Sequence, residues 1–403
     1  MKKRFLCAGL AAAMAVSLTA CGGSGSTAET KAEGSSASAE AKSEGSSGSA
    51  VFKIGGIGPI TGGAAVYGMA VQHGTELAVN EINAAGGING YQIEFQFQDD
   101  EHDAEKSVNA YNTLKDWGMQ VLVGTTTSAP CLAVADKSAA DNMFQITPSG
   151  SVVECAANPN VFRICYSDPD QGAASATYIG EHKLASKIAV IYDSSDVYSS
   201  GVYEKFAQEA PAQGIEIVAA EAFTADSNKD FSTQLQKAKD AGAEMVFLPI
   251  YYTEASLILQ QANTMGFSPL FFGVDGMDGI LQVKGFDTSL AEGLMLLTPF
   301  AADAKDDLTV QFVKAYEEAY GETPIQFAAD AYDAVYAVKA AIEDAKATPD
   351  MSVSDLCEAM KTSMLNIQLD GLTGIGMTWT EDGEPHKAPK AVKIVNGAYA
   401  AME

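Results

Sequence analysis

The amino-acid sequence predicts an α/β protein with two doubly wound lobes, each a parallel sheet with helices on both faces. From residue 51 onward, short runs of branched apolar residues alternate with longer amphipathic runs, which is typical of repeated βαβ units. The alternation occurs in two blocks of about 110 and about 125 residues, each long enough for one doubly wound lobe. The roughly 350 residues after the polar N-terminal segment are enough for two such domains.

The first block is predicted to contain four strands and three helices. Its first helix carries Ala70, Leu77 and Ile82 on one face at the helical period, as a helix that covers a sheet should. We expect strands at 51–55, 92–97, 121–124 and 144–147, and helices at 67–84, 104–117 and 130–141.

The second block repeats this order. We expect helices at 171–182, 200–213, 230–241 and 254–265, and strands at 187–192, 215–220, 245–249 and 270–273. The remainder holds two helices, 306–320 and 327–344, and a strand, 390–395, which we expect the two lobes to share. Ligands of such sheets bind beyond the carboxyl ends of the strands, so candidate site residues should lie in the loops there.

The first fifty residues indicate export and attachment to a membrane. A basic start precedes an apolar run at 5–18 that is too short to span a bilayer and is typical of a secretory signal. The run leads into a Leu-Thr-Ala-Cys motif ending at Cys21. This motif resembles a bacterial lipobox, which implies a signal peptide at 1–20 and an acylated Cys21. Residues 21–50 should form a flexible tether, because nearly all of them are Gly, Ser, Ala, Thr, Glu or Lys.

Composition and the lack of certain motifs argue against several classes of function. With 52 acidic and 25 basic residues, the net charge is −27, which disfavours nucleic acid and anionic lipid surfaces as partners. The cysteines after residue 21 form no Cys-x-x-Cys pair and the histidines stand far apart, so a structural zinc site has no support. A dinucleotide fingerprint, a P-loop and a nucleophile elbow are also missing. We therefore expect no metal, no cofactor and no enzymatic activity.

Short motifs stand in order at the expected strand ends and in the C-terminal part. They are Ile57–Gly68, Ala78–Gly90, Asp99–Asp100, Val123–Pro130, Ile146–Ser151, Phe162–Arg163, Tyr198–Gly201, Asp230–Ser232, Phe272–Gly276, Ala331–Ala334, Gly371–Gly374 and Trp379–Gly383. The series covers nearly all of residues 51–400 and resembles the type I periplasmic binding proteins, most closely the leucine/isoleucine/valine-binding family. No single motif decides this resemblance; the ordered series carries it.

The resemblance implies two lobes joined by three hinge crossings, near Asp168, Thr298 and Met377. One lobe would comprise residues 51–168 and 299–377, and the other would comprise residues 169–298 and 378–403. An amino acid would lie in the cleft, and the lobes would close on it about the hinges.

The resemblance also implies roles for eight residues around that cleft. Ser128 aligns with the contact to the ligand's α-carboxylate, and a helix N-terminus there would favour an anion. The carbonyl of Ser149, the hydroxyl of Ser151 and the carboxylate of Asp275 align with contacts to the α-ammonium. The residues that align with the lining of the side-chain pocket are Tyr67, Tyr198, Tyr251 and Phe327.

Each of these roles has a structural alternative. Ser128 could simply cap a helix, and the segment Ser149–Ser151 could simply form a turn. Asp275 could begin a turn with Gly276. The aromatic residues could be ordinary core packing, Phe327 above all, because it begins an amphipathic helix.

The sequence departs from the family pattern in two respects. The carboxylate that holds the ammonium is Glu in the best-known branch, and Asp275 is one methylene shorter. The family's disulfide partners align with His102 and Thr127, so that bridge is missing. Cys155 and Cys165 flank a nine-residue loop and could pair instead, or they could stay as free buried thiols.

These features predict an extracytoplasmic lipoprotein that captures an amino acid, expected to be leucine, isoleucine, valine or a similar aliphatic one, by hinge closure. The protein would deliver this ligand to an ABC permease and ATPase. We expect a monomer that meets the membrane only through its lipid anchor. Two alternatives stay open: a sensory receptor of the same fold, and a binder of another amino acid or a small amide.

Overall fold

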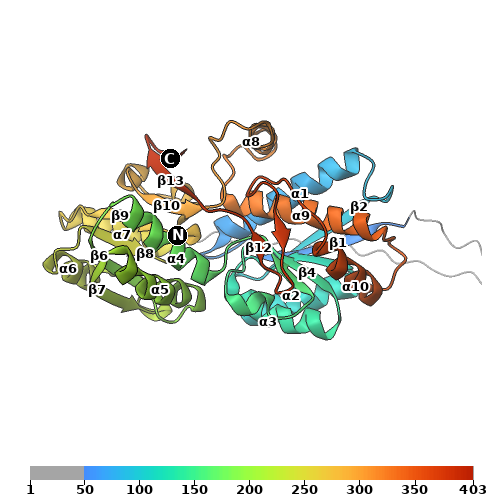
Figure 1. The fold of residues 1–403 in the computed structure, drawn as a ribbon, viewed down its shortest axis with the longest axis horizontal. Helices are drawn as coiled ribbons and strands as arrows, with labels where there is room; N and C mark the ends of the chain where they lie inside the picture. The colour runs from blue at the N-terminus through green and yellow to red at the C-terminus, as the bar shows by residue number, and fades with distance from the viewer. Residues whose placement is uncertain (1–49, 403) are drawn as a thin grey trace, which may run out of the picture. The chain divides into compact units, whose positions relative to one another are not determined.

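The computed structural model of the protein describes residues 50–402 (Figure 1). The predicted signal peptide, the predicted acylation site Cys21 and the tether up to residue 49 lie outside the described residues. Within residues 50–402, no helix is both long enough and apolar enough to cross a membrane. This part of the chain forms two large open sheets flanked by helices, which confirms the predicted fold class.

The first sheet contains five strands in the order β2-β1-β3-β4-β5, and every neighbouring pair runs parallel. Its third and fourth strands have the predicted bounds. The last strand is not predicted by the sequence, because its three residues are too few to form a pattern. The strands are β1 (Phe52–Gly58), β2 (Ile93–Asp99), β3 (Val121–Gly124), β4 (Phe144–Thr147) and β5 (Val161–Arg163).

Alternate side chains of the first sheet face different helices. Val121 and Val123 of β3 belong to the core that contains α1 and α9, whereas Leu122 packs with α2 and α3. This is the period of two of a strand, and both faces are buried because helices cover each side. The helices are α1 (Ala65–Ala84), α2 (Ala104–Trp117), α3 (Ser128–Ala140), α8 (Asp307–Tyr320), α9 (Gln326–Ala345) and α10 (Val353–Met364).

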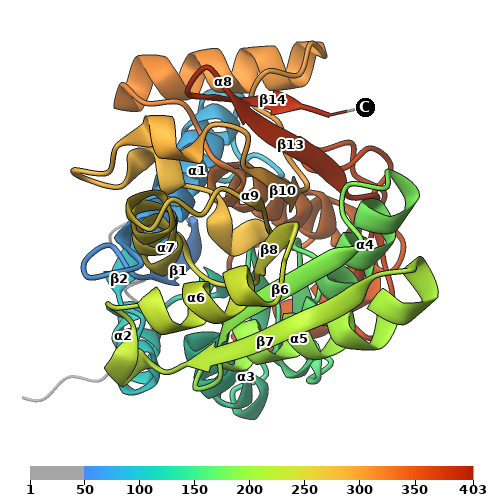
Figure 2. The same cartoon turned by 90° about the vertical axis from the view of Figure 1, so that its left-hand side faces the viewer.

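The second sheet contains seven strands in the order β14-β13-β10-β9-β8-β6-β7 (Figure 2). The expectation of a wholly parallel sheet is wrong at one edge, because β13 runs antiparallel to β10 and returns by a tight turn as β14. The sequence does not predict β10 or β14. The strands are β6 (Lys187–Asp193), β7 (Glu216–Phe223), β8 (Met245–Leu248), β9 (Leu270–Gly273), β10 (Met295–Thr298), β13 (Lys390–Val395) and β14 (Ala398–Ala401).

Helices also cover both faces of the second sheet. Val202 and Phe206 of α5 pack with Ile188 and Val190 of β6. Leu235 of α6 and Ile258 of α7 belong to the core on the other face. The helices are α4 (Asp168–Glu181), α5 (Val197–Glu209), α6 (Ser232–Asp240) and α7 (Tyr252–Thr264).

The C-terminal part of the chain packs helices against the first sheet and adds strands to the second. Helix α9 packs on α1 and on the strands of the first sheet, and α10 packs on α9 and β4. Strand β13 belongs to the second sheet. Along the chain, a small antiparallel hairpin of β11 (Thr378–Trp379) and β12 (Pro385–His386) lies between α10 and β13. The division of the chain into lobes at residues 168, 298 and 377 stays a prediction.

Candidate functional site

The eight residues that the family resemblance singles out line one narrow pocket, which has a cavity volume of about 10 Å³. Thr126, Thr127 and Gly276 complete its lining. Residues beyond the carboxyl ends of strands in both sheets contribute to it, which is where α/β proteins place their ligands. The eight residues are Tyr67, Ser128, Ser149, Ser151, Tyr198, Tyr251, Asp275 and Phe327.

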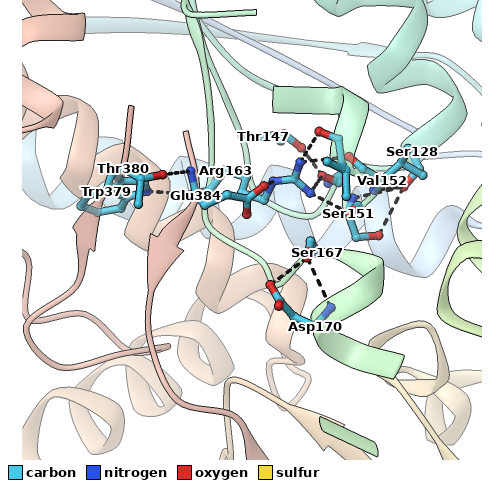
Figure 3. Close-up of polar contacts among 12 residues, drawn as sticks. Ser128, Thr147, Ser151, Val152, Arg163, Ser167, Asp170, Trp379, Thr380 and Glu384 are labelled. Carbon is cyan, nitrogen blue, oxygen red and sulfur yellow. Dashed lines mark hydrogen bonds and ion pairs between the residues drawn. The ribbon is translucent and has the colours of Figure 1, made fainter. Parts of the chain in front are cut away.

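Ser128 presents a hydroxyl donor at the N-terminus of α3 (Figure 3). The cap of this helix is Thr127, so the alternative that Ser128 is the cap is wrong. The Ser128 Oγ accepts hydrogen bonds from the backbone N–H groups of Ser151 and Val152, at 3.1 and 3.3 Å. Both lone pairs are then used, which leaves the hydroxyl proton for donation. A donor beside the positive end of a helix dipole suits an anion such as a carboxylate.

The loop after β4 carries Ser149 and Ser151 into the same pocket. The Ser149 hydroxyl donates to the carbonyl oxygen of Thr126 at 2.5 Å, which ties this loop to the one after β3. The Ser151 Oγ lies 3.3 Å from the Ser128 Oγ. The loop bends at residues 148 and 149, and the Gly150 N–H donates to the Thr147 side-chain Oγ1 at 2.7 Å. The alternative of turn chemistry therefore holds, and the side chains of Ser149 and Ser151 line the pocket as well.

Asp275 brings a buried carboxylate from the second sheet. It begins the 3-10 turn Asp275–Met277 after β9, so the turn alternative holds here too. Its Oδ1 accepts bonds from the Tyr198 hydroxyl and the Gly276 N–H, both at 2.6 Å, and its Oδ2 accepts one from the Gln171 amide at 2.9 Å. Burial raises the pKa of Asp275 to about 6, although these three bonds favour the ionised form. Among the described residues, no Lys, Arg or His forms an ion pair with it.

Four aromatic rings form the remaining wall. The Tyr67 ring lies 4.3 Å from Phe327 and 5.7 Å from Tyr251, and Tyr251 stacks on Tyr198 at 5.0 Å. The Tyr67 hydroxyl donates to the Gly276 carbonyl, which joins α1 to the loop after β9. Burial raises the pKa of all three tyrosines well above its ordinary value, so the wall is neutral. Its ring faces suit an apolar side chain.

Two polar residues near the site have no role in the family resemblance. Gln171 holds the Asp275 carboxylate, as described above. Asp168, the first residue of α4, is buried, and its Oδ1 has no hydrogen-bond partner within residues 50–402. Its N–H donates to the Ser151 carbonyl at 2.9 Å, and burial raises its pKa well above the ordinary value. In the sequence, Asp168 is an acidic residue that starts a helix directly after the loop at the end of a strand, and this pattern could have identified it as a site residue. The family resemblance marks Asp168 only as a crossing between lobes.

Of the two alternatives for the cysteines, a disulfide or free buried thiols, the structure shows free buried thiols. Cys131, Cys155, Cys165 and Cys357 are all buried free thiols, so a Cys155–Cys165 disulfide is wrong for this structure. Cys155 packs with Cys131 instead. The two positions where the family's disulfide would lie are linked by a hydrogen bond, because the His102 Nδ1 and the Thr127 Oγ1 are 2.8 Å apart.

Comparison with known proteins identifies the family. Residues 51–398 match the model of the periplasmic binding protein family. The chain is 32% identical over 306 residues to Leu/Ile/Val-binding protein homolog 3 of Brucella melitensis, covering 74% of this chain and 80% of that protein. It is 29% identical to the leucine-, isoleucine-, valine-, threonine-, and alanine-binding protein of Pseudomonas aeruginosa, covering 76% of this chain and 82% of that protein.

A solved structure shares the whole architecture. It is a branched-chain amino acid transporter substrate-binding protein from Streptococcus pneumoniae in complex with isoleucine. The match has a TM-score of 0.79 and 29% sequence identity, and it covers 87% of this chain and 98% of that one. The prediction from the ordered motifs is thereby confirmed: this chain belongs to the periplasmic binding protein family, in the branch of the Leu/Ile/Val-binding proteins.

Proposed function

We propose that the protein is the substrate-binding component of an ABC importer and captures a free α-amino acid with an aliphatic side chain, such as leucine, isoleucine or valine. One observation carries the proposal. A single pocket has a helix N-terminus at Ser128 that suits an anion, and a buried carboxylate at Asp275 that pairs with no cation within residues 50–402. A zwitterion satisfies both, because a buried charge is tolerated only when it is paired.

Each group of the ligand then has a partner. The Ser128 hydroxyl and the first N–H groups of α3, which have no intrahelical acceptor, bind the α-carboxylate. Asp275, the Ser149 carbonyl and the Ser151 hydroxyl bind the α-ammonium. Asp168 adds a second buried carboxylate next to Ser151. The aromatic wall takes the aliphatic side chain in a dry environment.

The pocket residues divide between the two proposed lobes. Ser128 and Phe327 fall in the lobe of residues 51–168 and 299–377, whereas Tyr198 and Asp275 fall in the lobe of residues 169–298 and 378–403. Closure about the hinges would therefore bring the carboxylate site and the ammonium site together. Nothing in this scheme needs a chemical step, so the protein would bind its ligand without converting it.

Titration calorimetry of the purified protein with the twenty amino acids tests the proposal. Leucine, isoleucine or valine should bind, and benzoate, which carries a carboxylate but no ammonium, should not. Small amides and purines test the alternative ligands. Saturable binding of benzoate or a purine, with none for any amino acid, would overturn the proposal.

Replacing Ser128 with Ala should weaken amino-acid binding by about 1.5–3 kcal/mol, because the charged carboxylate of the ligand loses the hydrogen bond from the serine hydroxyl. Ser138→Ala is a matched control on the same helix. The Ser138 hydroxyl is also buried and bonded, to the Ala135 carbonyl and the Gln145 side chain, but it does not line the pocket. Calorimetry should show reduced affinity for the first variant alone, and equal affinities would remove Ser128 from the site.

The family works outside the cytoplasm, and we propose that this member is held at the membrane by an acylated Cys21. Cys21→Ser should move the protein from the membrane fraction to the soluble fraction while ligand binding is unchanged. Cys7→Ser is the matched control, because it lies in the apolar part of the predicted signal and should leave attachment intact. A Cys21 variant that stays with the membranes would contradict the lipoprotein assignment.

The proposed partners are an ABC permease and its ATPase. Affinity purification of the tethered protein from membranes, in the presence of the bound amino acid, should recover both subunits. Recovery of a membrane receptor kinase instead would favour the sensory alternative.

A further inference from the structure

A buried arginine lies behind the loop that holds Ser151 (Figure 3). Arg163 ends β5, and it is the only arginine in the sequence after Arg4. After residue 4, every other Lys or Arg position holds lysine, so the arginine indicates a need for the planar fork of a guanidinium.

The guanidinium of Arg163 contacts four consecutive carbonyl oxygens. Its Nη1 donates to Gly150 and Ser151, at 3.3 and 2.6 Å. Its Nη2 donates to Val152 and Val153, both at 2.9 Å. A lysine ammonium is a single point and cannot make this set of contacts.

These contacts fix the direction of the loop's peptide groups. In a trans peptide the C=O and the following N–H point in opposite directions. The carbonyls of Gly150 and Ser151 point to Arg163, and the N–H groups of Ser151 and Val152 accordingly point to the Ser128 Oγ. Arg163 therefore turns the positive ends of two peptide dipoles toward the group that would bind the ligand's carboxylate.

The hairpin of β11 and β12 holds Arg163 from its other side. The Trp379 indole N–H donates to the Arg163 carbonyl at 2.8 Å, and the Arg163 N–H donates to the Gly383 carbonyl at 3.0 Å. The Glu384 carboxylate forms an ion pair with the Arg163 Nε at 3.2 Å. The Glu384 side chain is 29% exposed while that of Arg163 is fully buried, so water screens the anion more than the cation.

We propose that Arg163 is the positioning residue that makes the site prefer a carboxylate, acting through the peptide groups of residues 150–153 without touching the ligand. This inference rests on the proposed function. It predicts that substitutions of Arg163 change the relative affinity for ligands with a carboxylate and ligands with a neutral group in its place. A role in stability alone would not change this ratio. Glu384 reduces the preference for a carboxylate, because its negative charge offsets part of the positive charge of Arg163.

The test compares the dissociation constants of leucine and leucinol, which has a neutral hydroxymethyl group in place of the carboxylate. In Arg163→Lys the preference for leucine over leucinol should fall about tenfold, because the positive charge stays but the fork is lost. In Glu384→Gln all four carbonyl contacts stay and a negative charge disappears, so the preference should rise about twofold to threefold. Glu221→Gln breaks a remote ion pair with Lys237 and should leave the preference unchanged.

The outcomes separate the two proposals. If the wild-type protein binds no amino acid, the proposed function fails. If the wild-type protein binds leucine and folded Arg163→Lys keeps the wild-type preference, the role of Arg163 is refuted. Should Arg163→Lys not fold, as circular dichroism would show, Glu384→Gln decides: an unchanged or lower preference overturns the inference, and a raised one supports it.

Discussion

Replacing Asp275 with Asn should weaken amino-acid binding by about 3–5 kcal/mol, because the ligand's buried ammonium would lose its paired charge. The folded protein should tolerate the change. An Asn carbonyl can still accept from the Tyr198 hydroxyl and the Gly276 N–H, which now bond to the Asp275 Oδ1. The Asn NH2 would face the Gln171 NH2, which now donates to the Asp275 Oδ2 at 2.9 Å. Turning the Gln171 amide over lets its oxygen accept from the Asn NH2, and it gives up only the 3.3 Å bond that this oxygen accepts from the Asp275 N–H. Calorimetry measures the affinity, and thermal unfolding measures the stability.

Asp278→Asn is the control for this variant. Asp278 is a buried carboxylate three positions further along, and burial raises its pKa to about 6 as well. It accepts bonds from the N–H groups of Gln326 and Gly279, at 2.8 and 3.0 Å, but it does not line the pocket. Its replacement should lower stability and leave affinity unchanged. Undiminished affinity in Asp275→Asn would mean that the ligand has no ammonium at this position.

Local patterns in the sequence predict those elements whose ends are marked by a cap or a glycine, as Asp103 and Gly118 mark α2 and as Gly124 and Gly273 end β3 and β9. The bounds of β3, β9 and α2 agree with the prediction at every residue. In contrast, Met295–Thr298 lies inside a longer apolar stretch, and nothing local marks it as a strand. The antiparallel return of β13 and β14 depends on pairing across the sheet, and such pairing leaves no trace in the pattern of one segment.

The same limit applies to the site. The family resemblance singled out the residues that line the pocket, and most of them follow a strand that the alternation of strands and helices predicts, whereas Phe327 lies in the first turn of α9. The groups that orient these residues are remote in the sequence. Gln171 and Asp275 are 104 positions apart, and Trp379 and Arg163 are 216 apart. Only the folded chain brings them together, so sequence reasoning could assign the lining but not the network behind it.

Affinity for an amino acid should fall by about tenfold for each pH unit below about 6. Burial raises the pKa of Asp275 to about 6 in the ligand-free protein, and only the ionised carboxylate can pair with the ammonium. Each unit below that pKa reduces the ionised fraction about tenfold, so the dissociation constant at pH 4 should be roughly a hundredfold higher than at pH 7. Calorimetry across this range measures the slope, and Asp275→Asn should remove it.

The contribution of Asp275 to the stability of the ligand-free protein should fall as the pH rises, whereas the affinity for the ligand rises. The pKa of Asp275 is about 6 in the folded chain and near its ordinary value of 3.8 in the unfolded chain, so folding favours the protonated form. This contribution is fully present below pH 3.8 and is lost as the pH rises through about 6, and it amounts to something on the order of 3 kcal/mol. Asp275→Asn has no such group, so the stability of the wild-type protein relative to the variant should decline from pH 4 to pH 7.

Because binding strengthens over the same interval in which the empty protein loses this contribution, a bound amino acid should raise the melting temperature far more at pH 7 than at pH 4. An equal rise at both values would show that no buried carboxylate pairs with the ligand.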